Sequence, residues 1–143
     1  MHNLENCSLY LSGGMGRLSW EEQSEWRKKV IDEIKNRDCE KSVSFFNPVD
    51  YYNFKEVRYR TEKEIMVFDL NGVRRSDILV VNYNDPDSIG TAMEVMAAYE
   101  LKKPIIGINE SGHKLHPWLV ETATRMCSSL EEAIEHIVEF YLN

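Results

Sequence analysis

An unbroken apolar run near the middle of the chain constrains the fold most. Residues 77–82 read Asp-Ile-Leu-Val-Val-Asn, so four consecutive apolar side chains stand between polar ones. A strand of this kind is typical of a parallel sheet that helices cover on both faces. The segments on either side, 61–75 and 88–101, have helical patterns, and the alternation of helices with strands defines the α/β class. The run therefore predicts an α/β fold around a parallel sheet.

The remaining segments continue this alternation. Three predicted helices begin with a capping box, in which serine or threonine stands three residues before glutamate: Ser19 with Glu22, Thr61 with Glu64 and Ser129 with Glu132. The predicted strands are residues 8–12, 42–46, 77–82 and 104–108, and the predicted helices are 19–36, 61–75, 88–101 and a last one after Ser129. Right-handed crossovers then give one doubly wound, flavodoxin- or Rossmann-like parallel sheet of about five strands with helices on both faces. At 143 residues, we expect a single domain over 1–143.

Composition excludes several classes of function. Lysine and arginine number 17 against 24 aspartates and glutamates, which leaves a net charge of −7. A surface this acidic repels a nucleic acid polymer, although a single mononucleotide remains compatible with it. The N-terminus has no basic region followed by an apolar stretch, and no run of about 18 apolar residues occurs, so we expect neither export nor a membrane-spanning segment. The three cysteines form no C-x-x-C pair, which argues against a zinc site or a disulfide framework and favours a cytoplasmic location.

Two loops of the predicted sheet meet at the place where ligands bind in such folds. Ligands of open parallel sheets occupy the crevice at the carboxyl ends of the strands where the winding direction reverses, here between the first and third strands. The glycine-rich residues 12–17 follow the first strand, and residues 82–90 lead into a helix. Exposed amides at a helix start favour an anion, so a phosphate or carboxylate is the expected occupant. The spacing matches neither the dinucleotide motif nor the P-loop, and glycines that merely make a turn are the alternative.

Two acidic residues stand in apolar surroundings. Glu94 is the only charged residue in the helical segment 89–99, and a carboxylate buried there without a partner loses free energy or has a raised pKa. Asp69 is the one charged residue within the apolar run 65–70. Exposure to solvent on the outer face of its helix is the plain alternative for each acid. Two such acids in one small domain favour a catalytic pair, one ionised and one protonated, as in the cleavage of glycosidic bonds.

Three short segments carry a resemblance to the nucleoside 2-deoxyribosyltransferase family. Residues 10–15, Tyr-Leu-Ser-Gly-Gly-Met, resemble the family's first strand and loop, and residues 69–73, followed by Ser76 and Asp77, resemble its aspartate segment. Residues 88–94, Ser-Ile-Gly-Thr-Ala-Met-Glu, resemble the helix with the catalytic glutamate. The order and spacing of the three segments are shared, and the likeness spans most of the sequence. The resemblance implies an enzyme that acts on a small-molecule nucleoside or nucleotide.

The family's chemistry is a two-step displacement at the anomeric carbon of the sugar. By resemblance, Glu94 attacks, Asp69 protonates or holds the departing base, and Tyr10 orients Glu94. The sugar of a 2′-deoxynucleoside or its 5′-monophosphate then passes to water or to another base. The resemblance implies no cofactor and no metal, and we interpret His113 and His116, three residues apart in a loop, as incidental rather than as a metal pair.

The crevice loops contain most of the candidate substrate-binding residues, namely Gly13, Gly14, Met15, Arg17, Ser88 and Gly90. Six residues before the glutamate, transferases of free nucleosides commonly have an acid that holds the sugar hydroxyl, whereas this chain has Ser88. The related deoxynucleoside 5′-monophosphate N-glycosidases have a serine there, and a hydroxyl at a helix start accommodates a phosphate. We therefore favour a monophosphate, with Arg17 and Arg27 as candidates for the compensating charge. A solvated helix residue is the alternative for Arg27.

The resemblance also implies a homodimer or a higher homo-oligomer. In the family, the loop after the last core strand closes the pocket of a neighbouring subunit, and here that loop is residues 109–118. His116 is the candidate that reaches the neighbouring substrate. Trp118 is a second candidate, for which ordinary packing is the alternative.

A long stretch between the second strand and the next helix, residues 47–60, is rich in aromatic side chains: Tyr51, Tyr52, Phe54 and Tyr59. Long loops in compact domains often serve as lids, and aromatic side chains can stack on a base. A packed loop without a function of its own is the alternative.

Two other functions fit parts of the pattern. The same fold can serve a binding module that holds a nucleotide-derived small molecule without turning it over. Gly90, Thr91 and Glu94 also match the G-T-x-x-E of the cytokinin-activating phosphoribohydrolases. The Pro-Gly-Gly that precedes that motif is missing here, so we rank this last function lowest.

Overall fold

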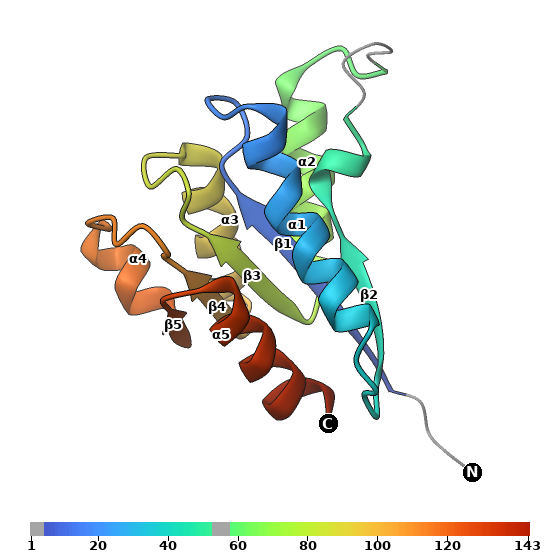
Figure 1. The fold of residues 1–143 in the computed structure, drawn as a ribbon. Coiled ribbons are helices and arrows are strands. Elements are labelled where there is room, and N and C mark those ends of the chain that lie inside the picture. Colours follow the sequence, from blue (N-terminus) through green and yellow to red (C-terminus); the bar gives the residue numbers. More distant parts are fainter. Residues whose placement is uncertain (1–4, 53–57) are drawn as a thin grey trace.

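Residues 5–52 and 58–143 are described by the computed structural model, in which five parallel strands form one sheet of order β2-β1-β3-β4-β5 (Figure 1). The strands are β1 (Asn6–Gly13), β2 (Ser42–Phe46), β3 (Ile78–Asn82), β4 (Ile105–Ile108) and β5 (Arg125–Cys127). The helices are α1 (Trp20–Lys35), α2 (Glu62–Arg75), α3 (Ile89–Glu100), α4 (Pro117–Thr122) and α5 (Leu130–His136). A 3₁₀ turn (Pro48–Asp50) follows β2, and α5 continues as a π-helical stretch (Ile137–Leu142). The predicted α/β class is confirmed.

The long helices begin at the residues that their capping boxes predict. Ser19 caps α1 and Thr61 caps α2, each with its hydroxyl accepting from the third helical amide and with the glutamate side chain returning the bond. One α-helix and one strand were not predicted, the six-residue α4 and the three-residue β5. Both are too short for their hydrophobic periodicity to show in the sequence.

The helices cover the two faces of the sheet in two groups (Figure 1). Trp26 of α1 and Ile134 of α5 pack with Leu9 and Leu11 of β1 in one apolar core. The second core, on the opposite face, joins Tyr10 to residues of α2, α3 and β3, with α4 at its margin. Because side chains alternate along a strand, Ser12 shares the face of Tyr10. Strand β1 therefore presents two hydroxyl groups, one above the other, toward α2 and α3.

The strand order places a topological switch point between β1 and β3. The chain leaves β1 toward β2 on one side, and it returns through α2 to β3 on the other. The loops after β1 and β3 therefore lie together at the carboxyl ends of the strands, as the sequence predicts. Among the described residues, no helix is long and apolar enough to cross a membrane.

Candidate active site

Glu94 lies against the two hydroxyl groups of β1. The Tyr10 hydroxyl donates a hydrogen bond to Glu94 Oε2, and Ser12 Oγ donates to Glu94 Oε1 over 3.1 Å. Tyr10 and Ser12 are fully buried, while Glu94 keeps some solvent contact. The ring of Tyr10 is fixed by stacking on Phe46 of β2, with ring centroids 4.9 Å apart. Both oxygens of the Glu94 carboxylate therefore accept hydrogen bonds from side chains of a single strand, β1.

Asp69 of α2 has a separate partner. Its Oδ1 accepts a hydrogen bond from the hydroxyl of Tyr52, which comes from the segment after the 3₁₀ turn. The alternative for Asp69 was full exposure on the outer face of its helix. In the structure Asp69 is only partly exposed. Its negative charge acts on both Glu94 and Tyr10, which places the two acids in one electrostatic environment.

Both acids bind protons more tightly than free side chains do. Burial, supported by the charge of Asp69, raises the pKa of Glu94 to about 7, although the hydrogen bonds from Tyr10 and Ser12 oppose the rise. Burial raises the pKa of Asp69 to about 6, and the hydrogen bond from Tyr52 opposes this rise. Burial and the charge of Glu94 also raise the pKa of Tyr10, so its hydroxyl remains a proton donor. Near neutral pH, one acid can thus be ionised while the other carries a proton.

Arg27 of α1 lies behind this centre and is completely buried. Its guanidinium donates to the carbonyl oxygens of Leu11, at 3.2 Å, and Gly13, at 3.3 Å. Burial lowers its pKa to about 10, which leaves it charged at neutral pH. The interpretation of Arg27 as a solvated helix residue is wrong. Its side chain binds the backbone on either side of Ser12.

The glycine loop and the loop after β3 are joined by an ion pair. Arg17 Nε donates to Asp85 Oδ2 at 3.0 Å, and a second nitrogen of the guanidinium binds Asp85 Oδ1. Asp85 is almost fully buried, and the arginine holds the pKa of its carboxyl below the usual value. The charge expected to serve a phosphate is therefore already paired with an acid in this structure.

The glycine loop is also bound through its backbone. The amide of Gly14 donates to Asn84 Oδ1 over 3.1 Å, and the carbonyl of Met15 accepts from Gln23 Nε2 over 2.6 Å. A Cβ on Gly14 would lie 2.6 Å from Cβ of Asp85, so any other residue would push the two loops apart. This close approach favours a structural role for Gly14, whereas Gly13 adjoins Ser12 directly.

The start of α3 is capped by Ser88. Its Oγ accepts from the Thr91 amide at 3.3 Å and from the Thr91 hydroxyl at 2.9 Å. Gly90 is exposed, and a Cβ there would meet no atom within 4 Å. The surface above this helix start is therefore open, which is compatible with a ligand at the predicted position.

His116 lies in a different part of the molecule, at the start of α4. Its Nδ1 accepts from the amide of Trp118 over 3.1 Å, and the two rings meet edge to face. Both side chains are exposed, and Trp118 retains 70% of its accessible surface. Trp118 is thus not packed in the interior of this chain, as the alternative of ordinary packing required. The reach of residues 109–118 into a neighbouring pocket stays a prediction.

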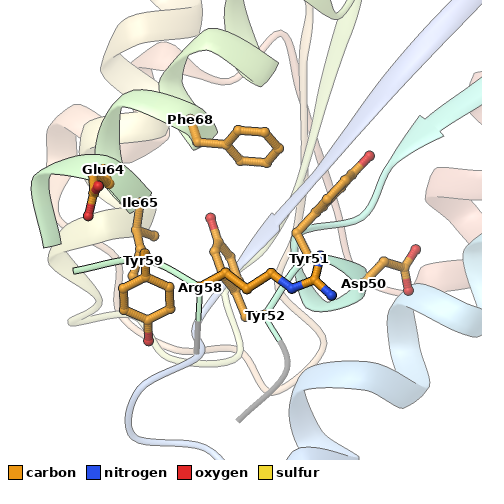
Figure 2. A pocket seen from close by; sticks show the side chains of 8 residues that line it. All are labelled: Asp50, Tyr51, Tyr52, Arg58, Tyr59, Glu64, Ile65 and Phe68. Carbon is orange, nitrogen blue, oxygen red and sulfur yellow. The ribbon is translucent and has the colours of Figure 1, made fainter. Parts of the chain in front are cut away.

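A cavity of about 480 Å³ opens beside Tyr52 (Figure 2). Its walls are formed by Asp50, Tyr51, Tyr52, Arg58, Tyr59, Glu64, Ile65 and Phe68. Tyr51 stacks on Phe46, which in turn stacks on Tyr10, so an aromatic column joins the cavity to the acid pair. Three aromatic residues of the predicted lid therefore line a cavity, while the fourth, Phe54, lies outside the described residues.

Two contacts of this centre were missed from the sequence, those of Ser12 with Glu94 and of Tyr52 with Asp69. Alternation along β1 would have found Ser12, because it stands two residues after Tyr10 on the same face. No local pattern indicates Tyr52 as the partner of Asp69, since they are joined only by the fold. Within residues 5–52 and 58–143, no cluster of three or more His, Cys, Asp or Glu is placed to hold a metal ion.

Comparisons with known proteins give a family and a fold. Residues 9–137 match the family described as nucleoside 2-deoxyribosyltransferase. A conserved protein from Enterococcus faecalis has a similar structure, with a TM-score of 0.77 and 20% identity, over 92% of this chain and 96% of that one. A 2-deoxyribosyltransferase from Bacillus psychrosaccharolyticus has a TM-score of 0.71 and 17% identity, over 90% of each chain. A CMP N-glycosidase from Clostridium botulinum has a TM-score of 0.57 and 14% identity, over 91% of this chain and 97% of that one. No curated protein sequence matches the chain significantly.

Proposed function

The chain belongs to the nucleoside 2-deoxyribosyltransferase family, and we propose that it cleaves the N-glycosidic bond of a 2′-deoxynucleoside or 2′-deoxynucleoside 5′-monophosphate through a covalent intermediate on Glu94. The observation that carries the proposal is the pair of hydroxyl groups, from Tyr10 and Ser12, that hold the Glu94 carboxylate, on which the charge of Asp69 acts. Membership of the family goes with deoxyribosyltransferase or N-glycosidase activity. The nucleophile, the acceptor and the substrate are the parts that we propose.

In the first step, an oxygen of ionised Glu94 attacks the anomeric carbon. A bond forms between this oxygen and C1′, while the bond from C1′ to the base nitrogen breaks and leaves its electron pair on the base. Asp69 in its protonated form gives its proton to the departing base. The pKa of Asp69, raised to about 6, keeps a minor fraction of this acid protonated at neutral pH. Glu94, with a pKa of about 7, shares the same proton, so the reactive form is the one in which that proton lies on Asp69.

In the second step, water or another base attacks C1′ and releases Glu94. The incoming nucleophile loses its proton to the carboxylate of Asp69, which restores the starting state. The Tyr10 hydroxyl stays a donor to Glu94 throughout, because burial and the neighbouring acids raise its pKa. No step requires a metal or an organic cofactor, since the reacting groups are two carboxyl groups and a heterocycle.

We assign the base to the aromatic cavity beside Tyr52. Tyr51, Tyr52 and Phe68 line it, and planar bases stack on aromatic rings (Figure 2). The assignment fits the position of Asp69, because Tyr52 both lines the cavity and binds this acid. A base held there would present its nitrogen to the acid that protonates it.

The 5′ end of the sugar would lie toward Ser88 and Gly90, where the surface above the helix start is open. A free hydroxyl and a phosphate both fit a helix start. The pairing of Arg17 with Asp85 weakens the case for Arg17 as a phosphate ligand. The serine at position 88 supports a monophosphate. Because these two observations point in opposite directions, the proposal keeps both the nucleoside and the monophosphate as substrates.

We also propose that the enzyme works as a homodimer or higher homo-oligomer in the cytoplasm. Ile89 and Met93 of α3 and Trp118 of α4 are exposed apolar side chains on one side of the sheet, and α3 packs against α4. A second copy that covers them would bring the 109–118 loop toward a neighbouring site. The three cysteines are unpaired, which supports a reducing compartment.

Liquid chromatography of reactions with common 2′-deoxynucleosides and their 5′-monophosphates, with and without an acceptor base, tests the proposal. We expect free base without an acceptor, or an exchanged nucleoside with one, and no product from Glu94→Ala. Absence of product from every substrate with the wild-type protein would refute the enzymatic function. In that case, a ligand recovered intact and thermal stabilisation that survives Glu94→Gln would identify a binding module instead.

A further inference from the structure

We infer that Ser12 is a positioning residue that stabilises the ionised form of Glu94 and fixes the plane of its carboxylate for attack. The inference rests on the proposed function, since it assigns to Ser12 a part in activating the same nucleophile. Ser12 does not touch the reacting carbon, so it acts through Glu94.

The two hydroxyl groups of β1 divide the carboxylate between them. Ser12 Oγ donates to Oε1 over 3.1 Å, and the Tyr10 hydroxyl donates to Oε2. A carboxylate with a donor on only one oxygen can still turn about its terminal bond, because that torsion is soft. Donors on both oxygens fix the plane of the group. The Ser12 hydrogen bond is therefore the contact that fixes the orientation of the Glu94 carboxylate, which Tyr10 alone would leave free to rotate.

The backbone around Ser12 is itself immobilised. Arg27 donates to the carbonyl oxygens of Leu11 and Gly13, the residues on either side of Ser12. A Cβ on Gly13 would lie 2.9 Å from Cζ2 of Trp26 and 3.2 Å from the Asn82 carbonyl oxygen, so the strand end is tightly enclosed. Ser12 is fully buried between these contacts. Its hydroxyl has a fixed origin, as a group that aims another side chain requires.

The electrostatics give this hydroxyl a measurable effect. The groups that act on Glu94 come from three elements: Tyr10 and Ser12 from β1, Asp69 from α2 and Arg27 from α1. Burial and Asp69 raise the pKa of Glu94, whereas the two hydroxyl groups and Arg27 lower it. Loss of the Ser12 hydroxyl removes one of the stabilising contacts of the anion, so the pKa should rise further.

The strand supplies a matched control in Ser8. Ser8 lies on the same face of β1, and its Oγ donates to Asp77 Oδ2 over 3.1 Å, at the opposite end of the strand. Both Ser8→Ala and Ser12→Ala remove a hydroxyl that binds a carboxylate. Of these two serines, only Ser12 binds Glu94. A general effect of removing a serine hydroxyl from β1 should therefore appear in both variants, whereas a positioning effect should appear in Ser12→Ala alone.

The experiment measures kcat, KM and the pH dependence of kcat/KM for wild type, Ser12→Ala, Ser12→Cys and Ser8→Ala. We expect Ser12→Ala to lower kcat about tenfold, the loss typical of a hydrogen bond to a charged group, with a KM change below about threefold. The acid limb of its pH profile should move up by about one pH unit. Ser12→Cys, which fills the volume with a weak donor, should shift the limb in the same direction, and Ser8→Ala should not.

A second measurement does not depend on turnover. Carbon-13 NMR titration of the Glu94 carboxyl group, assigned by its loss in Glu94→Gln, should give a higher pKa in Ser12→Ala than in the wild type. An unchanged pKa of Glu94 in Ser12→Ala would overturn the role of Ser12 while leaving the proposed function intact. So would an unmoved acid limb together with a kcat within about twofold of the wild-type value. A wild-type protein inactive on every substrate would refute the proposed function, and the titration alone would then decide whether Ser12 stabilises the anion.

Discussion

Two acids at the same edge of the sheet are held in opposite ways. Asp85, in the loop after β3, is almost fully buried and forms a two-point ion pair with Arg17, which lowers its pKa. Glu94, one helical segment later, is held by the hydroxyl groups of Tyr10 and Ser12, and its pKa is raised to about 7. The two carboxyl groups thus depart from their usual pKa in opposite directions within ten residues of each other.

The difference separates an acid used for structure from one available for chemistry. The Arg17 pair ties the glycine loop to the loop after β3, and the backbone amide of Asp87 adds a further bond to Asp85. Glu94 has no ion pair within the described part of the chain, so its negative charge is stabilised by neutral donors and by Arg27 behind them. Neutral donors stabilise an anion without neutralising it, which leaves the oxygen nucleophilic.

The largest expected effect is on turnover. Glu94→Gln should lower kcat/KM roughly 10⁴-fold, because the amide cannot form the ester intermediate. Asp85→Asn should lower it less than about tenfold, since it loosens the loop but leaves the acid pair in place. Steady-state kinetics on the best substrate of the panel measure both. Equal losses in the two variants would remove the distinction between the two acids.

Asp69 gives the next largest effect. Asp69→Asn should lower the rate of base release about 10²- to 10³-fold, because the leaving nitrogen no longer receives a proton. The loss should nearly vanish for a 7-methylated purine deoxynucleoside, whose base already carries a positive charge and leaves without protonation. Single-turnover rates with the methylated and unmethylated substrates compare the two cases. The same loss on both substrates would contradict the role of a general acid.

Stability should change in opposite directions at the two acids. An acid whose pKa is raised on folding loses its stabilising contribution as pH rises from the pKa of the unfolded chain through the folded value, which is about 7 for Glu94. Glu94→Gln should therefore stabilise the protein at pH 8 by on the order of 2 kcal/mol, and the gain should shrink as pH falls toward 5. An acid with a lowered pKa stabilises the fold at neutral pH and loses this effect in acid, so Asp85→Asn should lower the melting temperature at pH 8. Thermal melts at pH 5 and pH 8 measure both. A destabilised Glu94→Gln at pH 8 would contradict the raised pKa.

The smallest expected effect concerns the phosphate. If the Arg17 pair is structural, Arg17→Ala should lower the kcat/KM for nucleosides and for monophosphates by similar factors, so that their ratio changes less than about threefold. Parallel kinetics on one deoxynucleoside and its 5′-monophosphate measure this ratio. A selective loss of activity on the monophosphate would instead assign Arg17 to phosphate binding, as the sequence alone suggested.

The fold was predictable to the extent that its signals are local. The run from Ile78 to Val81 predicts a strand buried on both faces, and β3 is fully buried. Ser19 and Thr61 mark the starts of α1 and α2 through bonds that span three residues. Strand β5 and helix α4 were not predicted, because three and six residues are too few for a hydrophobic pattern to repeat.

The acids of the candidate site were predictable, but their partners were only partly so. Glu94 and Asp69 stand out because each is a charge in an apolar segment, and Tyr10 followed from a family resemblance. Ser12 needed only the alternation along β1. The bond from Tyr52 to Asp69 and the pair of Arg17 with Asp85 span 17 and 68 residues, and no local rule reaches that far.

The sequence by itself determined which segments become strands and helices and which two acids stand in apolar company. These properties depend on neighbours within about one helical turn, where spacing and side-chain type are visible in the chain. Only the tertiary structure decided what each charge contacts. A carboxylate acquires its pKa from groups that folding brings beside it, so hydroxyl groups from β1 met Glu94 while an arginine met Asp85.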